Sequence, residues 1–306
     1  MDTIVDKQII WAKRNGIVLD GKRPYAKLIE NNLFKSLSTE TRIEFENGDG
    51  GELKPKDGSP AKMAALRSSS ALCVNVFDYF RDKPDELHEL MVAMGLIKSQ
   101  NKCRAKLKFE CKDYKIYARG KHISTPNIDV VIETINPLSN KKHVYIIESK
   151  FTEPYFSHSI NFFRKEYYLK DNILDIWRGP LENLYSAFGL EEANEKTQTI
   201  DKRSVNGKFI KQKFNYLDAA QLTKHLMGTL QKEQKSNVTL VYLWYDKDGE
   251  MGAEHRKEIE EFVKITHAAK VDFKHCSYQE LIIGLYNKLD YTIHKKYLDY
   301  ITERYL

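Results

Sequence analysis

Three charged side chains interrupt a stretch that otherwise has the composition of a buried hairpin, NIDVVIETINPLSNKKHVYIIESK, residues 127–150. Asp129 lies near the start of the first apolar run, and Glu148 and Lys150 close the second. Acids and lysines are rarely buried without a partner, so the three groups need a reason to be there. A divalent cation bound by the two carboxylates supplies that reason, because hard oxygen ligands suit Mg²⁺.

An antiparallel pairing of the two apolar runs brings these side chains together. If Asp129 lies opposite Glu148, the turn falls in the middle of NPLSNKK, whose Asn, Pro and Ser favour a turn. Side chains alternate along a strand, so Glu148 and Lys150 share a face. In this register Asp129 shares that face too, with its Cβ about 5 Å from the Cβ of Glu148.

The combination of two acids and a lysine indicates a particular chemistry. Two carboxylates at such a short distance repel each other, and this repulsion raises the pKa of one of them. A divalent cation bound between them removes the repulsion. The lysine can hold and polarise a water molecule at the metal, and that water is a nucleophile for in-line attack on a phosphodiester. Metal and ammonium also stabilise the charge of the transition state. The alternative is an ion pair at a hairpin end with no catalytic role.

The rest of the chain predicts the elements that would position this site. We expect helices at 3–14, 23–37, 68–80, 84–96, 216–233, 253–266, 277–289 and 291–305, a loop at 46–60, and strands at 104–120 (as a pair or one bent strand), 128–135, 143–151, 237–246 and 270–276. Helices come first, then an antiparallel strand group, then alternating helices and strands. This order predicts an α/β fold with a mixed central sheet flanked by helices.

Asp129, Glu148 and Lys150, as D…ExK on adjacent strands, resemble the PD-(D/E)xK nuclease superfamily, which includes many restriction endonucleases. The proline before the acid is Pro126, two residues further from Asp129 than in a contiguous PD pair. The segments ENNLF, GGEL and SSSALCVNVF look like a subgroup of bacterial restriction-type nucleases. The resemblance to the nuclease core covers roughly residues 104–150 and 216–276.

The resemblance implies an organisation and an activity. A restriction-endonuclease-like core is expected at 101–290 with an insertion at about 155–215, an N-terminal helical region at 1–100 packed on the core, and a C-terminal helix at 291–306. The implied activity is Mg²⁺-dependent hydrolysis of double-stranded DNA by an endonuclease, of the type II restriction kind. Mn²⁺ is expected to substitute for Mg²⁺.

The resemblance also assigns roles within the site. Asp129 and Glu148 would bind the metal, with the backbone carbonyl of Ser149 as a further ligand, and Lys150 would orient and activate water. Glu30 is a candidate for another ligand, because related nucleases often lend an acid from an early helix to the metal. Its alternative is an ordinary position on a solvated helix face.

Several further residues are weaker candidates. Gln221 is expected to bond to the scissile phosphate or to Lys150, or else to lie on a helix surface. His225, one turn later, suits packing or a phosphate contact better than general-base catalysis. Glu110 is expected as an edge-strand charge that could support the site, and Glu52 is as ambiguous as Glu30.

Two segments mix basic and aromatic residues in a way that can hold a phosphate backbone and stack bases. The candidate DNA contacts are Arg164, Lys165 and Tyr167 in segment 162–170, and Lys208 and Lys211 in segment 201–213. A solvated charged surface is the alternative for both segments.

Composition sets broader limits. The formal charge of +6 and pI of about 8.8 fit a polyanionic partner without requiring one. We find no apolar run of membrane-spanning length and no signal peptide at the start, and the four cysteines form no C-x-x-C pair. These features predict a cytoplasmic protein with reduced thiols.

Other functions remain open from the sequence. A nucleic-acid-binding module that keeps the fold without the chemistry is one alternative, and a nuclease of repair, recombination or phage defence is another. A homodimer would suit cutting both strands of a symmetric site, but no sequence stripe identifies its interface.

Overall fold

A five-stranded mixed sheet forms the centre of the molecule in the computed structural model, with strands in the order β1-β4-β5-β9-β10. The structure describes residues 3–21, 23–48, 51–56, 58–118, 121–156, 162–163, 191–193, 209–211 and 214–306. The strands of the sheet are β1 (Arg104–Cys111), β4 (Ile128–Ile135), β5 (Lys142–Lys150), β9 (Val238–Trp244) and β10 (Phe273–Ser277). The first three are antiparallel and the last three are parallel, which confirms the predicted mixed sheet.

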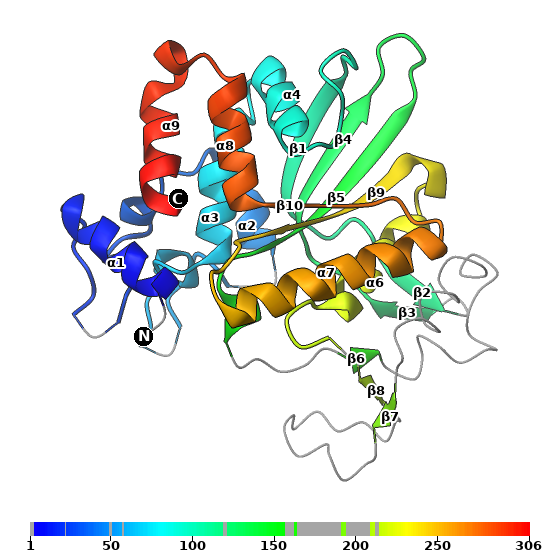
Figure 1. Ribbon diagram of the computed structural model, residues 1–306, viewed down its shortest axis with the longest axis horizontal. Coiled ribbons are helices and arrows are strands. Elements are labelled where there is room, and N and C mark those ends of the chain that lie inside the picture. The colour runs from blue at the N-terminus through cyan, green and yellow to red at the C-terminus, as the bar shows by residue number, and fades with distance from the viewer. Residues whose placement is uncertain are drawn as a thin grey trace.

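Helices cover both faces of this sheet (Figure 1). One face carries α2 (Thr39–Asn47), α3 (Ser69–Phe77), α4 (Pro84–Ala93), α8 (Tyr278–Lys288) and α9 (Tyr291–Tyr305), and the other carries α6 (Ala219–Leu230) and α7 (Glu250–Ala268). Helix α1 (Thr3–Arg14) packs against α9. The short 3₁₀ helices are η1 (Ile29–Asn32), η2 (Lys62–Ala64), η3 (Asp78–Phe80), η4 (Glu153–Tyr155) and η8 (Lys235–Asn237). Small sheets are formed by β2 (Ile116–Ala118) with β3 (Lys121–Ser124), and by β6 (Phe162–Phe163), β7 (Glu191–Ala193) and β8 (Phe209–Lys211).

The hairpin β4–β5 forms in the register that the sequence predicts. Val130 lies opposite Ile147, and continuing this register places Asp129 opposite Glu148. The side chain of Asn136 closes the turn by accepting two backbone N–H groups. Composition and strand alternation together therefore fix this hairpin before any long-range contact is considered.

The central strands are buried on both sides. Every residue of β9 is buried, and Leu240 and Val241 belong to different hydrophobic clusters. One cluster lies beneath α3, α4, α8 and α9, and the other lies beneath α6 and α7. A parallel strand covered by helices on both faces has a nearly continuous run of apolar residues, and β9 is therefore easily predicted from the sequence.

The two ends of the described chain pack together through Arg304 in α9. Its guanidinium binds the side chain of Gln8 at 3.0 Å and the backbone carbonyl of Asn32 at 2.8 Å. Gln8 in turn donates to the carbonyl of Arg304 at 2.8 Å. These buried contacts join the N-terminal segment to the last helix.

The predicted helix at 23–37 is wrong. Tyr25 and Ala26 form isolated β-bridges, and only the short η1 follows. The buried side chain of Asn32 donates to the carbonyls of Met63 and Ala65, at 2.7 and 2.8 Å. These long-range bonds fix an irregular backbone against the local helical pattern.

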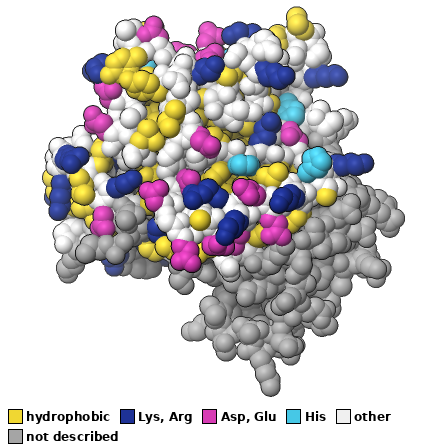
Figure 2. Space-filling view, viewed as in Figure 1, with side chains coloured by type: hydrophobic (Ala, Val, Ile, Leu, Met, Phe, Trp, Pro, Cys, Tyr) yellow, Lys and Arg dark blue, Asp and Glu magenta, His cyan; other side chains and the backbone are white. Residues whose placement is uncertain are grey.

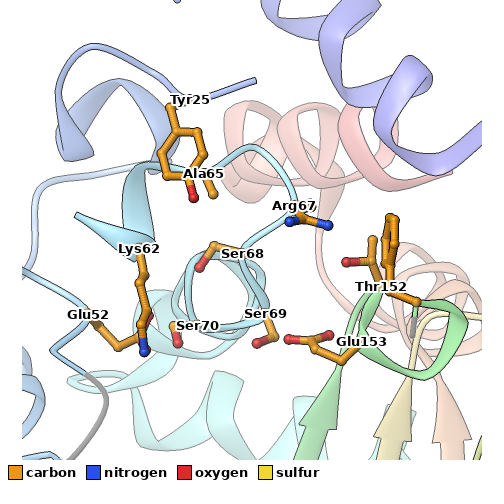
Figure 3. Close-up of a pocket in the computed structure, with 11 residues that line it drawn as sticks. Tyr25, Glu52, Lys62, Ala65, Arg67, Ser68, Ser69, Ser70, Thr152 and Glu153 are labelled. Atoms are coloured by element: carbon orange, nitrogen blue, oxygen red, sulfur yellow. The ribbon is translucent and has the colours of Figure 1, made fainter. Parts of the chain in front are cut away.

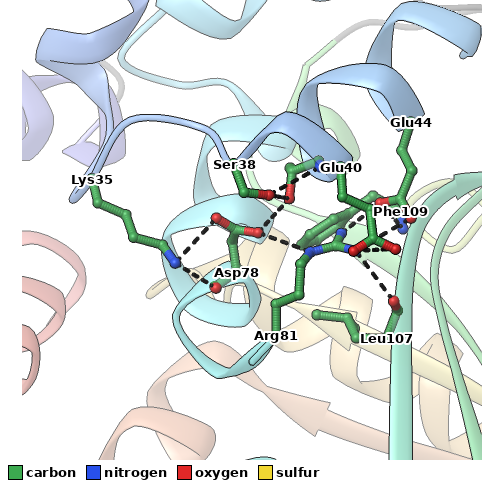
Figure 4. A network of polar contacts seen from close by, with 9 residues as sticks. Lys35, Ser38, Glu40, Glu44, Asp78, Arg81, Leu107 and Phe109 are labelled. Carbon is green, nitrogen blue, oxygen red and sulfur yellow. Dashed lines mark hydrogen bonds and ion pairs between the residues drawn. The ribbon is translucent and has the colours of Figure 1, made fainter. Parts of the chain in front are cut away.

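A polar network joins α2 to the edge strand β1 (Figure 4). Arg81, whose side chain is 5% exposed, lies 2.5 Å from Glu44 and 3.2 Å from Asp78. Glu44 also accepts the backbone N–H of Phe109 at 3.0 Å. The network therefore fixes the backbone of β1 at Phe109, the residue that precedes Glu110.

Replacing Arg81 by alanine is expected to lower the free energy of unfolding by about 3–5 kcal/mol, because Asp78 and Glu44 lose their buried partner. Urea denaturation measures this loss. Arg42→Ala is the matched control, since Arg42 forms an exposed pair with Glu30 at 3.7 Å and should cost less than about 1 kcal/mol. Equal effects of the two substitutions would contradict the assignment.

A buried histidine on α7 fixes the turn that follows β5. His255 is fully buried, with Nδ1 3.0 Å from the hydroxyl of Tyr155 and Nε2 3.0 Å from the hydroxyl of Tyr242. Tyr155 donates its proton to the carbonyl of Tyr245, so Nδ1 is the donor and Nε2 accepts from Tyr242. Burial, with Arg256 nearby, lowers the pKa of His255 to about 3.

This histidine should make the fold sensitive to acid. Its pKa in the folded chain lies below its ordinary value, so stability is lost as the pH falls from about 6.5 towards 3, by up to about 1.4 kcal/mol per pH unit. We expect His255→Gln to flatten this dependence in thermal unfolding measured from pH 7 to 4. The exposed His267→Gln is the control, and a dependence unchanged in His255→Gln would refute the prediction.

Candidate active site

Glu148 and Lys150 lie at the end of the central strand β5, beside β9. Glu148 is 1% exposed, and the side chain of Lys150 is 18% exposed. The ammonium of Lys150 lies 2.5 Å from Oε1 of Glu148, and the two groups form an ion pair. The angles at this contact lie outside the range of a regular hydrogen bond. A pair this deeply buried is not an ion pair on the protein surface.

Helix α6 contributes two further side chains to this pair. Lys150 donates to Oε1 of Gln221 at 3.0 Å. One turn later, Nδ1 of the buried His225 lies 3.3 Å from Oε2 of Glu148. The structure therefore brings the strand pair and the two helix residues together, and Gln221 contacts Lys150, one of the two partners that the sequence offered for it.

Asp129 lies at the open end of the β4–β5 hairpin, next to the last paired residue of β4, Val130. Its Oδ2 accepts the backbone N–H of Ser149 at 2.8 Å. The side chain also lines a small cavity with Glu110, Cys73 and Ser149 beside the N-terminus of α3. The N–H of Ser149 bonds to the side chain of Asp129 and not to the backbone of β4, so regular pairing between β4 and β5 ends here.

The predicted alternation of faces stops at Asp129, so its side chain lines the cavity beside α3 and, against the prediction from the sequence, does not share the face on which Glu148 contacts His225 of α6. Val130 belongs to the cluster beneath α3, but its neighbour Ile128 belongs to the cluster beneath α6. On β1, Phe109 belongs to the cluster beneath α3, whereas Cys111 belongs to the cluster beneath α6. Glu110, which lies between them, has a φ of +46°. Such a backbone is unusual for a non-glycine residue and indicates a local kink.

Glu110 is thereby turned inward. It is buried rather than an exposed edge-strand charge, and its carboxylate accepts from the side chain of Asn127. Burial and the charge of Asp129 raise its pKa to about 7. The sequence carries no local signal for this kink, so the predicted edge-strand charge at Glu110 is wrong.

Charge within the site is unevenly shared. Burial and then the charge of Glu148 raise the pKa of Asp129 well above its ordinary value. Burial also raises the pKa of Glu148 to about 7, against the opposing effect of Lys150. Burial acts to lower the pKa of Lys150, but both carboxylates together hold it above the ordinary value. Burial and Lys150 lower the pKa of His225 to about 3, so His225 is neutral.

The donor set fits a hard divalent cation. Both oxygens of Glu148 are buried, and neither makes a hydrogen bond of good geometry with a described residue. Within the described ranges, no group of three or more His, Cys, Asp and Glu side chains is arranged as a metal site. Two carboxylates, with a backbone carbonyl and water, nevertheless suit Mg²⁺, which needs only one or two carboxylates.

Other predicted site residues do not join this cluster. Glu30 lies in η1, and its half-exposed carboxylate pairs with Arg42 at 3.7 Å. Glu52 lies 3.5 Å from Lys62 in a neighbouring pocket. Arg164, Lys165, Tyr167 and Lys208 lie outside the described residues, as does the side chain of Lys211 and most of the predicted insertion at 155–215.

The face seen in Figure 2 carries basic and acidic side chains intermingled. Helix α7 illustrates this, with exposed Glu254, Lys257, Glu261 and Lys264 along its length. A polyanion is attracted by a surface of one sign, and the described residues on this face form no patch of one sign. Among the residues that the structure describes, no helix has the length and apolar character needed to cross a membrane.

The chain matches a known protein family over nearly its whole length. A family model described as "Restriction Endonuclease associating with ARP" matches residues 6–306, nearly the whole chain. No curated protein and no solved structure matches the chain.

Proposed function

The chain belongs to the family of restriction endonucleases associating with ARP, and from this premise we propose that it is a Mg²⁺-dependent DNA endonuclease of the PD-(D/E)xK type. The substrate we propose is double-stranded DNA, cut in type II restriction. The observation that carries this proposal is the contact of the half-buried Lys150 with both the buried Glu148 and Gln221, beside Asp129.

In this proposal Asp129, Glu148 and the carbonyl of Ser149 hold the metal. When bound, Mg²⁺ supplies a water nucleophile near neutral pH and stabilises charge on the phosphoryl oxygens. Glu148 keeps Lys150 protonated, and Gln221 directs its ammonium. Lys150 then orients the attacking water by donating to it and offsets the negative charge that develops on the phosphate.

The geometry supports this function over a binding module that has lost its chemistry. A module that only binds DNA has no need of a half-buried lysine between a buried carboxylate and an amide. Taking the charges of Glu148 and Lys150 out of water has a desolvation cost, and a module that only binds DNA would gain nothing in return. We further propose a cytoplasmic location, and a homodimer that cuts both strands of a symmetric site.

The test is incubation of phage and plasmid DNA with the full-length protein in Mg²⁺, in Mn²⁺ and in EDTA. Discrete fragments in either metal, and none in EDTA, are the expected result, and sequencing of their ends gives the site. Diffuse degradation with the same metal dependence would move the role to repair, recombination or phage defence. DNA binding without cleavage in any divalent metal would overturn the enzyme and favour the binding module.

A further inference from the structure

A pocket of about 360 Å³ lies beside the candidate active site (Figure 3). This volume is within the range of about 300–1,000 Å³ that is usual for small-ligand sites. Four segments far apart in sequence line it: Tyr25, Glu52, residues 62–70 and residues 152–156. No part of the proposed hydrolysis uses this pocket.

The pocket adjoins the reacting groups. Ser69 and Ser70 line both this pocket and the small cavity that contains Asp129. Glu153, which Figure 3 shows facing Ser69, follows Lys150 by three residues, and its charge acts on the pKa of Lys150. An occupant of this pocket would therefore lie close to the phosphate being cut.

The charges of the lining disfavour a backbone phosphate as that occupant. The ionisable lining residues are Glu52, Lys62, Arg67 and Glu153, whose formal charges sum to zero. Lys62 is already 3.5 Å from Glu52, and Glu153 accepts the N–H of Phe151 at 2.9 Å. A phosphate would meet two carboxylates here without a surplus of positive charge.

The same lining suits a nucleobase. Carboxylates accept from the amino and imino groups of a base, while Arg67 and the hydroxyl of Ser69 can donate to its carbonyls and ring nitrogens. Tyr25 and Phe156 supply aromatic surface, and the guanidinium of Arg67 lies 4.7 Å from the ring centroid of Phe156. Bases that leave the duplex are held by hydrogen bonds and stacking of this kind.

We propose that this pocket receives one nucleobase, turned out of the duplex next to the phosphodiester that is cut. The proposal rests on the proposed endonuclease function and adds a specificity site to it. Glu153 and Arg67 would read the edge of the base, and Tyr25 or Phe156 would stack on its plane.

The experiment uses duplexes that contain the cleavage site mapped with the wild-type protein. Each purine near the cut is replaced in turn by 2-aminopurine and each cytosine by pyrrolocytosine, whose fluorescence rises when they leave the stack. The Lys150→Ala protein binds these duplexes without cutting them. We expect a several-fold rise in fluorescence at one position beside the cut, and a mismatch at that position should tighten binding several-fold.

Arg67→Ala, added to Lys150→Ala, should remove most of this rise. Arg67 is exposed, so the substitution should not disturb folding. Arg14→Ala, an exposed arginine in the last turn of α1, is the matched control and should keep the full rise. Tyr25→Leu tests the stacking wall independently.

The outcomes separate this inference from the function on which it rests. If the wild-type protein cuts DNA but no position becomes fluorescent, the base pocket is wrong and the endonuclease stands. A rise that persists in both Arg67→Ala and Tyr25→Leu also overturns the pocket. A protein that neither cuts nor binds DNA overturns both proposals.

Discussion

Replacing Lys150 by alanine should lower the rate of DNA cleavage by about a thousandfold while the chain stays folded. The ammonium of Lys150 lies 2.5 Å from Glu148 and 3.0 Å from Gln221, in the position from which it can orient water. Without it, Glu148 can bind a proton, because burial already raises its pKa to about 7. Single-turnover cleavage in Mg²⁺ measures the effect.

Lys142→Ala is the matched control for this loss. Lys142 lies at the other end of β5 and pairs with Glu133 and Glu233 at 3.4 and 2.7 Å. Its substitution removes the same charge from the same strand and should change the cleavage rate less than about twofold. Cleavage by Lys150→Ala within about tenfold of the wild-type rate would show that Lys150 has no part in the chemistry.

Asp129→Asn should abolish cleavage and at the same time stabilise the metal-free protein. The pKa of Asp129 is raised, so the ionised carboxylate opposes folding increasingly as the pH rises above its ordinary value of about 3.9. Asparagine keeps an oxygen that can accept the N–H of Ser149. We expect a higher Tm than wild type at pH 7.5 in EDTA, by about 2–4 °C for each kcal/mol gained, and little difference near pH 4.

Mg²⁺ provides the second half of this prediction. A cation that binds only the folded state raises Tm, so the wild-type protein should gain stability in Mg²⁺ and Asp129→Asn should gain much less. Asp113→Asn, which changes an exposed carboxylate paired with Lys108 at 3.2 Å, is the control and should respond to Mg²⁺ like wild type. An Asp129→Asn protein that is less stable in EDTA and still gains fully from Mg²⁺ would contradict the assignment.

The parts of the fold that depend on short-range patterns could be predicted from the sequence. The β4–β5 hairpin follows from two apolar runs around a turn, and its register, which pairs Val130 with Ile147, is the predicted one. The helix predicted at 277–289 is α8, and the structure shows that a capping box of Ser277 and Glu280 begins it. Gln221 contacts Lys150 because its helix, α6, lies between the neighbouring strands β5 and β9 in sequence and packs on the sheet.

The parts that depend on contacts between distant segments could not be predicted. Segment 23–37 has helical spacing, but the bonds of Asn32 to Met63 and Ala65 impose another backbone. Helix α2 buries only Thr41 and Phe45, so it carries little periodic signal and was missed. The inward turn of Glu110 needs a positive φ that no composition rule assigns to glutamate.

The site shows the same division. The sequence supplied the acid pair and the lysine, but it gave no sign that His225 would lie 3.3 Å from Glu148 in a neutral state. The pocket beside the site unites four segments, and such a convergence exists only in the folded chain. The prediction of Glu30 as a metal ligand depends on the helix predicted at 23–37, and it fails because that segment forms only the short η1.

The measurement that tests the central claim most directly is DNA cleavage in water enriched in ¹⁸O, with Mg²⁺ present. Hydrolysis by a water that Lys150 orients predicts one ¹⁸O atom in the terminal phosphate of each cut, and no cuts when EDTA replaces Mg²⁺. Mass spectrometry of the fragment ends gives the result. Cuts that lack ¹⁸O, or that persist in EDTA, would show that metal-dependent hydrolysis at Asp129, Glu148 and Lys150 is not what this protein does.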